Sequence, residues 1–69
     1  MKGVIVFDPI KGYSFKTPIK CYWCYGEWFS SIDEIKNQFP DINFHDEVLP
    51  LNPAPYFEIA KILATKDAK

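Results

Sequence analysis

Arginine is absent from this chain of 69 residues, whose eight basic residues are all lysine. The planar guanidinium group of arginine is the side chain best suited to bidentate contacts with phosphate, carboxylate and guanine. Its absence disfavours sequence-specific reading of DNA and tight binding of phosphate. The net charge of -1 likewise provides no general attraction to nucleic acid or to a membrane surface.

Long hydrophobic runs are also missing. The first apolar segment, residues 4–7, is too short for a signal peptide or a membrane span, so we expect a cytoplasmic protein. The chain has only two cysteines and one histidine. In a reducing cytosol we expect the cysteines to remain thiols unless they bind metal or take part in redox chemistry.

What the chain does contain is apolar surface: 48% of its residues are hydrophobic and 17% are aromatic. This composition predicts one ordered domain over residues 1–69, close to the smallest size that folds on a hydrophobic core, with a frayed tail at residues 65–69. Charge is unevenly distributed, because residues 23–58 carry one lysine and seven acids between two basic ends. This acidic middle is either a solvated surface or a docking face for a basic partner.

Three strands are predicted in the first part of the chain. Residues 3–7 form a continuous apolar run that ends at Asp8-Pro9, which is typical of a strand buried on both faces at the centre of a sheet. Residues 13–16 alternate apolar and polar side chains, which indicates a hairpin partner. Residues 19–25 are predicted to form the third strand, which is again apolar on both faces.

Two helices and an edge strand are predicted in the second part. Ser31 and Glu34 have the spacing of a capping box, and Pro40 closes the helix that follows them. Residues 43–49 are predicted to form an edge strand. Pro53 is suited to the first turn of a second helix. The apolar stripe expected on that helix consists of Tyr56, Ile59, Ala60 and Leu63.

The element order is therefore βββαβα, and the predicted fold class is α+β. We expect a small single-layer antiparallel four-stranded sheet with two helices on one face. The opposite face would be uncovered and unusually hydrophobic, because two of its strands are apolar on both sides. A monomer rarely exposes such a patch unless it binds something there.

Residues 21–29 are the richest source of candidate interaction residues. They contain five aromatic side chains and both cysteines, while charge within the segment is sparse. Tryptophan and tyrosine are the residues that most often dominate binding energy at protein interfaces. The predicted interaction residues are Tyr22, Trp23, Tyr25, Glu27, Trp28 and Phe29.

Cys21 and Cys24 have the C-x2-C spacing of a zinc knuckle or of a redox dithiol. A zinc set would consist of these cysteines and His45, with a fourth ligand from Asp41 or Asp46. A straight strand through both cysteines directs their side chains to opposite faces, which excludes a shared metal or a disulfide without a local turn. A redox site also needs a helix that begins at the cysteines, whereas the predicted helix begins much later. We therefore interpret both as small hydrophobes.

Residues 20–45 show a local resemblance to C2H2 zinc fingers. An aromatic-rich C-x2-C is followed by Phe29 and then by Ile35 at the start of a helix. Gln38 stands where the first zinc histidine of that family would be, and His45 lies too far along the chain. The resemblance implies a zinc-dependent nucleic-acid-binding module that is degenerate at its ligands.

No combination of side chains predicts catalysis. His45 lies in an acidic cluster without a nucleophile placed by any motif, and no two acids share a focus. The sequence therefore predicts a small non-enzymatic protein-interaction module of the inhibitor, adaptor or effector type. It would use no cofactor and would bind a protein partner, or its own copy as a homodimer, through an aromatic sheet face; nucleic acid and membrane are not expected partners. The alternatives are a small-ligand or nucleotide binder with an aromatic pocket around Trp23 and Trp28, or the degenerate zinc module.

Overall fold

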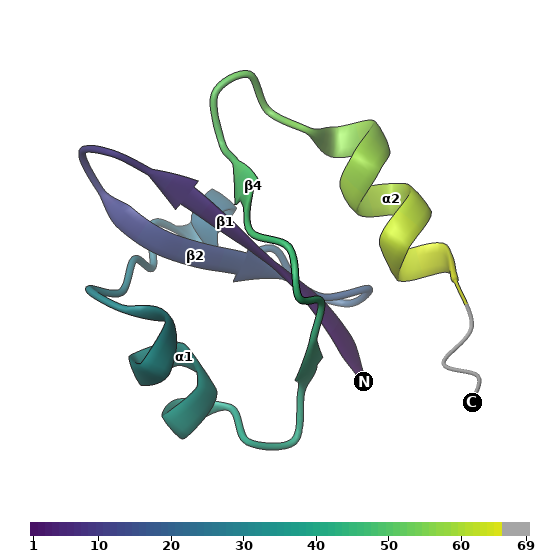
Figure 1. Ribbon diagram of the computed structural model, residues 1–69, viewed down its shortest axis with the longest axis horizontal. Coiled ribbons are helices and arrows are strands. Elements are labelled where there is room, and N and C mark those ends of the chain that lie inside the picture. The colour runs from purple at the N-terminus through teal and green to yellow at the C-terminus, as the bar shows by residue number, and fades with distance from the viewer. Residues whose placement is uncertain (66–69) are drawn as a thin grey trace.

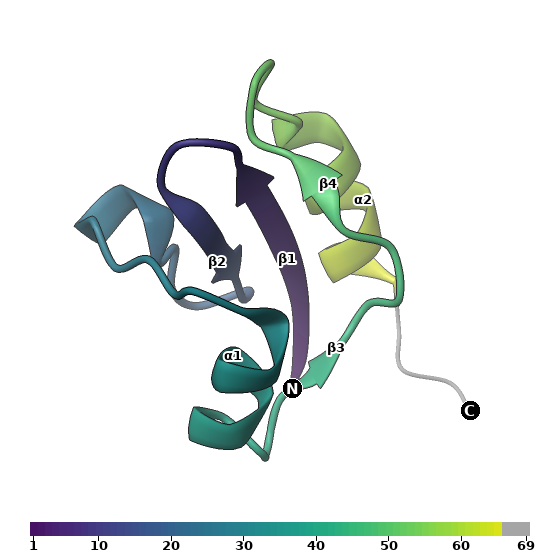
Figure 2. The ribbon, with the colours of Figure 1, turned by 60° about the vertical axis from the view of Figure 1, so that its left-hand side comes forward.

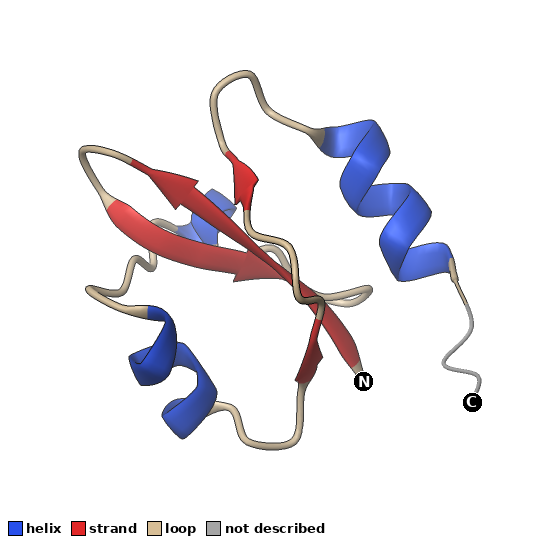
Figure 3. Cartoon of the chain, viewed as in Figure 1, coloured by secondary structure: helices blue, strands red, loops and turns tan. Residues whose placement is uncertain are grey.

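The fold is α+β, as predicted, with a mixed four-stranded sheet and two helices (Figures 1 and 3). The computed structural model describes residues 1–65 of the chain. The predicted fraying of residues 65–69 concerns a segment that, apart from Thr65, lies outside these residues. The elements are β1 (Lys2–Asp8), β2 (Gly12–Lys16), the 3₁₀ turn η1 (Trp23–Tyr25), α1 (Ile32–Gln38), β3 (Asn43–Phe44), β4 (Leu49–Pro50) and α2 (Tyr56–Ala64).

β1 is the central strand, and residues 3–6 of its apolar run are buried as predicted, while Phe7 at the end of the run is 37% exposed. Val4, Ile5 and Val6 are each exposed by 1% or less. Their side chains alternate between the two faces of the sheet, because successive residues of a strand point in opposite directions. β2 pairs with β1 as an antiparallel hairpin, which also confirms the prediction.

The sheet is mixed, so the prediction of a purely antiparallel sheet is wrong. β3 and β4 both pair with β1 in parallel, at Lys2 and Gly3 and at Val6 and Phe7 respectively. They occupy the edge of β1 opposite β2 and replace the single edge strand expected over residues 43–49. The chain leaves β2, crosses one face of the sheet as α1 and then adds these two short strands (Figure 2).

The two helices cover opposite faces of the sheet, which corrects the prediction that both lie on one face. α2 contributes Ile59 to a cluster with Val4, Val6 and Leu49, here called the α2-side cluster. α1 contributes Ile35 to the α1-side cluster, whose buried members are Ile5, Phe15 and Ile35. Figure 2 shows β1 and β2 between the two helices. The uncovered hydrophobic sheet face predicted from the sequence is therefore not present.

The third predicted strand, residues 19–25, does not form. Thr17 starts a tight turn, because its hydroxyl accepts the N–H groups of Ile19 and Lys20 at 3.3 and 3.0 Å. The chain then enters the 3₁₀ turn η1, which ends at Gly26 with a left-handed φ of 76°. Only one bridge to β2, between Lys16 and Cys21, remains of the expected strand in this stretch.

α1 begins as the capping box predicts and ends before Pro40. The Ser31 hydroxyl accepts the N–H of Glu34 at 3.2 Å. The Glu34 carboxylate reaches back to the N–H of Ser30, at 3.1 Å, instead of to the cap residue itself. The first bond satisfies a backbone donor that a helix N-terminus leaves unpaired, and the second ties the residue before the cap to the first turn of the helix.

α2 begins at Tyr56, later than the start predicted at Pro53. The stripe it buries is also rotated from the predicted one. Ile59 is fully buried, and Ile62 and Leu63 pack against the α2-side cluster, while Tyr56 and Ala60 are exposed.

Candidate functional site

The aromatic segment, residues 21–29, runs along the outer edge of β2. Near one end, the N–H of Tyr22 donates to the carbonyl of Phe15 at 2.9 Å. At the other end, Tyr13 and Phe29 exchange backbone hydrogen bonds of 2.9 and 2.7 Å. The segment therefore covers an edge that would otherwise expose unpaired backbone groups, although it is not itself a strand.

Tyr22 and Trp23 anchor this segment in the two clusters. The Tyr22 ring stacks on Phe15 in the α1-side cluster, with the ring centroids 4.1 Å apart. The Trp23 ring packs against the α2-side cluster, and its centroid lies 6.3 Å from that of Tyr56. Its indole Nε1 is buried and meets no hydrogen-bond acceptor within residues 1–65, so apolar packing alone holds the ring.

Other side chains of the segment face solvent. Tyr25 is 67% exposed, and the Lys20 Nζ lies 5.5 Å from the centre of its ring. Trp28 is half-buried beneath Lys11, whose Nζ lies 5.6 Å from the ring centre. Among the predicted interaction residues, Tyr25 and Glu27 are exposed, Trp28 is partly exposed, and Tyr22, Trp23 and Phe29 pack against the clusters.

The turn η1 brings the two cysteines together, contrary to the expectation from a straight strand. The backbone is helical from the cap residue Tyr22 through η1, and a 3₁₀ turn has three residues per turn, so Cys21, two residues before η1, lies on the same side as Cys24. The Cys21 thiol donates to Cys24 Sγ at 2.6 Å. Cys24 is exposed and Cys21 is half-buried. Burial, and then the hydrogen bond to Cys24, raises the pKa of the Cys21 thiol from 9.0 to about 11.

The proposed zinc ligands are not assembled. His45 lies just after β3, where its backbone N–H donates to the carbonyl of Gly3 at 2.8 Å. Within residues 1–65 no three His, Cys, Asp or Glu side chains gather in a way that could hold a metal ion. Cys21 and Cys24 are therefore neighbours without the third ligand that the sequence assigned to His45.

An apolar hollow that the sequence analysis missed lies at the turn of the β1–β2 hairpin, beside β4. Its cavity volume is about 310 Å³. Ile10 at the hairpin tip is 91% exposed, and Phe7 is 37% exposed with its ring centroid 4.9 Å from that of Tyr13. The sequence signal was an isoleucine placed in a turn, where polar residues are the rule. We call this region the hairpin-end surface; it is lined by Phe7, Asp8, Pro9, Ile10, Pro50 and Asn52.

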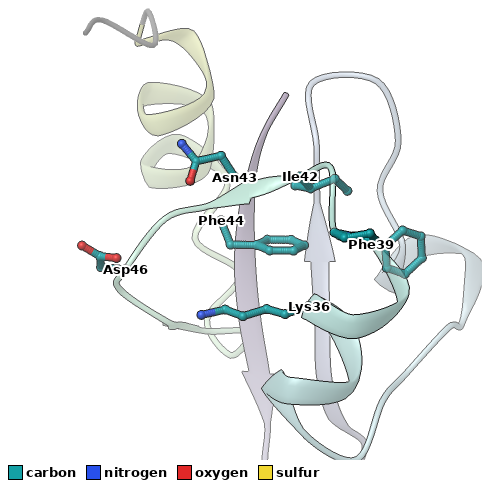
Figure 4. Close-up of a pocket in the computed structure, with 7 residues that line it drawn as sticks. Lys36, Phe39, Ile42, Asn43, Phe44 and Asp46 are labelled. Atoms are coloured by element: carbon teal, nitrogen blue, oxygen red, sulfur yellow. The ribbon is translucent and has the colours of Figure 1, made fainter.

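A second hollow, of about 340 Å³, lies between α1 and β3 (Figure 4). The Phe44 ring forms part of its wall, with Lys36 and Asp46 as the charged side chains beside it. Its lining combines one cation, one acid and one amide with apolar residues. Neither hollow is lined by Trp23 or Trp28, the residues expected around a nucleotide pocket.

Comparison with known proteins gives no relative: no family model, curated protein or solved structure matches the chain. None of the helices within residues 1–65 has the length and apolar character needed to cross a membrane. The geometry described above is therefore the only basis for a functional assignment.

Proposed function

We propose that this chain is a small, non-enzymatic protein-binding module whose contact region is the hairpin-end surface. The observation that carries the proposal is Ile10, a large apolar side chain that is 91% exposed beside an apolar hollow. An apolar side chain that lies in water gains free energy when a partner covers it. The hollow provides a place for an apolar side chain of the partner.

Rigid support favours this region over the other exposed apolar side chains. Phe7 and Pro50 are paired residues of β1 and β4, so the floor of the hollow belongs to the sheet. Trp28, one of the interaction residues predicted from the sequence, adjoins the hairpin tip through its contact with Lys11. By contrast, Phe57 is 88% exposed but projects from a helix and lines neither hollow.

The partner that fits is another protein, with an apolar side chain next to lysine or arginine. Asp8 lines the hollow, and its carboxylate accepts an exposed hydrogen bond from the backbone N–H of Lys11 at 3.0 Å. A basic side chain of the partner would complement this carboxylate. Self-association is less favoured, because a second copy would bring its own Asp8 carboxylate to the same surface. In this proposal the module works in the cytoplasm, where the two thiols remain reduced by default.

Two matched substitutions test the proposal. Ile10→Asp places a charge on the hairpin-end surface, and Phe57→Asp places the same charge at an equally exposed position on α2. Immobilised wild-type and variant chains are incubated with native cell extract, and bound proteins are quantified by mass spectrometry. Loss of an interface anchor worth about 2 kcal/mol weakens binding about 30-fold. We expect Ile10→Asp to lose a specific protein that the wild type and Phe57→Asp both retain.

The other outcomes contradict the proposal. Equal binding by all three chains, loss on Phe57→Asp as well, or the absence of any reproducibly bound protein would each exclude the hairpin-end surface as the contact region. Light scattering on the purified chains completes the test. A wild-type dimer that Ile10→Asp converts to a monomer would identify a second copy as the occupant and overturn the proposal of a different partner.

A further inference from the structure

The two cysteines lie side by side at the start of η1, because Cys21 precedes this turn and Cys24 lies within it. The Cys21 thiol donates to Cys24 Sγ at 2.6 Å, so the two sulfur atoms are in direct contact. We propose that Cys21 and Cys24 form a redox-active dithiol that closes to an intramolecular disulfide by exchange with a small-molecule disulfide. This proposal is independent of the binding function proposed above.

The backbone around the pair is held in place from both sides. The N–H of Tyr25 and the N–H of Glu27 both donate to the carbonyl of Tyr22, each at 3.1 Å. Between the cysteines, Tyr22 is stacked in one cluster and Trp23 is packed in the other, so the backbone that carries the two cysteines is anchored on both sides of the sheet. A disulfide requires its two side chains to face one another, and this turn provides that arrangement before oxidation.

The two sulfurs differ in access, which assigns their roles. Cys24 is exposed, so it is the thiol that reaches a disulfide in solution. Cys21 is half-buried directly behind it and is placed to attack a disulfide formed on Cys24. Burial, and then the hydrogen bond to Cys24, raises the pKa of Cys21, so this thiol keeps its proton in the reduced pair and the first attack falls to Cys24.

Oxidised glutathione serves as the oxidant in two successive thiol–disulfide exchange steps. The Cys24 thiolate attacks one glutathione sulfur, and the glutathione disulfide bond breaks as a mixed disulfide forms and one glutathione thiolate leaves. The Cys21 thiolate then attacks Cys24 Sγ, which forms the internal disulfide and expels the second glutathione thiolate. The protein loses two electrons, the glutathione disulfide gains them, and the two thiol protons pass to the released glutathione.

The test measures the thiol state of the reduced full chain in defined mixtures of reduced and oxidised glutathione. Acid quenching and blocking with N-ethylmaleimide are followed by trypsin, which cuts after Lys20 and Lys36 and places both cysteines on one peptide, residues 21–36. As oxidised glutathione increases, we expect the doubly labelled peptide to give way to an unlabelled peptide that carries no glutathione and whose mass is that of the reduced, unlabelled peptide less two hydrogen atoms. Dithiothreitol should restore the labelled form.

Two single substitutions separate the roles of the sulfurs. Cys21→Ser should accumulate a stable glutathione adduct on Cys24, because no second thiol can displace it. Cys24→Ser should form its adduct on Cys21 more slowly. The proposal is overturned if the wild-type thiols stay labelled in excess oxidised glutathione, if the wild type also stops at the glutathione adduct, or if it forms disulfides between chains instead. Since the wild-type measurement needs no substitution, it remains decisive even if a variant fails to fold.

Discussion

A set of isoleucine-to-valine substitutions tests whether the two helices support separate clusters. Ile35 on α1 and Ile59 on α2 are both 0% exposed and belong to different clusters. Loss of one buried methylene equivalent costs about 0.8 kcal/mol by transfer, and observed Ile→Val costs are about 0.5–1.5 kcal/mol. A domain of this size has a total stability of roughly 3–10 kcal/mol, so single and double variants should all remain folded. Because the sheet lies between the two sites, we expect their costs to add within about 0.5 kcal/mol.

The assay is urea denaturation followed by tryptophan fluorescence, for each single variant and for the pair. Ile5 lies in the same cluster as Ile35 and gives the positive control, a pair whose costs should couple by about 0.5 kcal/mol or more. Ile10, which is 91% exposed, gives the baseline for the same substitution in solvent. A coupling free energy between Ile35→Val and Ile59→Val as large as that of the control pair would refute the separation of the core into two clusters on opposite faces of the sheet. An Ile59→Val cost no greater than that of Ile10→Val would show that α2 does not cover the sheet.

Four further results are expected. Gly12 has φ of 106°, so Gly12→Ala should destabilise the fold by about 1–3 kcal/mol through backbone strain, and the added Cβ, 2.5 Å from the carbonyl oxygen of Phe29, adds a steric cost. Thermal denaturation measures this loss, and an unchanged melting temperature would contradict the turn geometry. Ser31→Ala removes the N-cap of α1 and should cost about 1 kcal/mol in urea denaturation, whereas no loss would show that the cap is not formed. Oxidation of Cys21 and Cys24 closes a four-residue loop and should stabilise the chain by about 2 kcal/mol at 25 °C, which raises Tm by roughly 8–16 °C. The same oxidising treatment should leave the Tm of the variant with serine at both positions unchanged. In the reduced protein, folding raises the pKa of Cys21 from 9.0 to about 11, so the folded state binds this proton more tightly than the unfolded state. The free energy of unfolding should therefore fall between pH 9 and 11 by more than it does in Cys21→Ser. Equal losses in the two chains would count against the burial of this thiol.

The hairpin and α1 were predictable because each depends on residues close together in the sequence. The apolar run of β1 ends at Asp8-Pro9, and β2 follows directly after a short turn. α1 begins at a serine cap with a glutamate three residues later and ends before Pro40. Such signals act through local hydrogen bonds and backbone preferences, which do not depend on the rest of the fold.

The prediction of a strand over residues 19–25 is wrong because the aromatic residues there fit both a strand and a 3₁₀ turn. In a strand, Tyr22 and Trp23 would point to opposite faces, and they also reach opposite clusters from the 3₁₀ turn that actually forms. What distinguishes the two is the hydroxyl of Thr17, which reverses the chain beforehand, and Gly26, which ends the turn in a left-handed conformation. The proximity of the cysteines follows from the turn and not from the strand. No periodicity in residues 21–29 carries this information.

The sequence by itself determined the α+β class, the buried central strand, the hairpin and the capped helix, because propensity, capping and alternation act over a few neighbouring residues. The tertiary structure decided which face each helix covers, the parallel pairing of β3 and β4 with β1, and the contact between Cys21 and Cys24. These features depend on how distant segments compete to bury one apolar strand from two sides. Covering both faces of β1 removed the hydrophobic sheet face expected from the sequence and left the exposed apolar surface at the end of the hairpin.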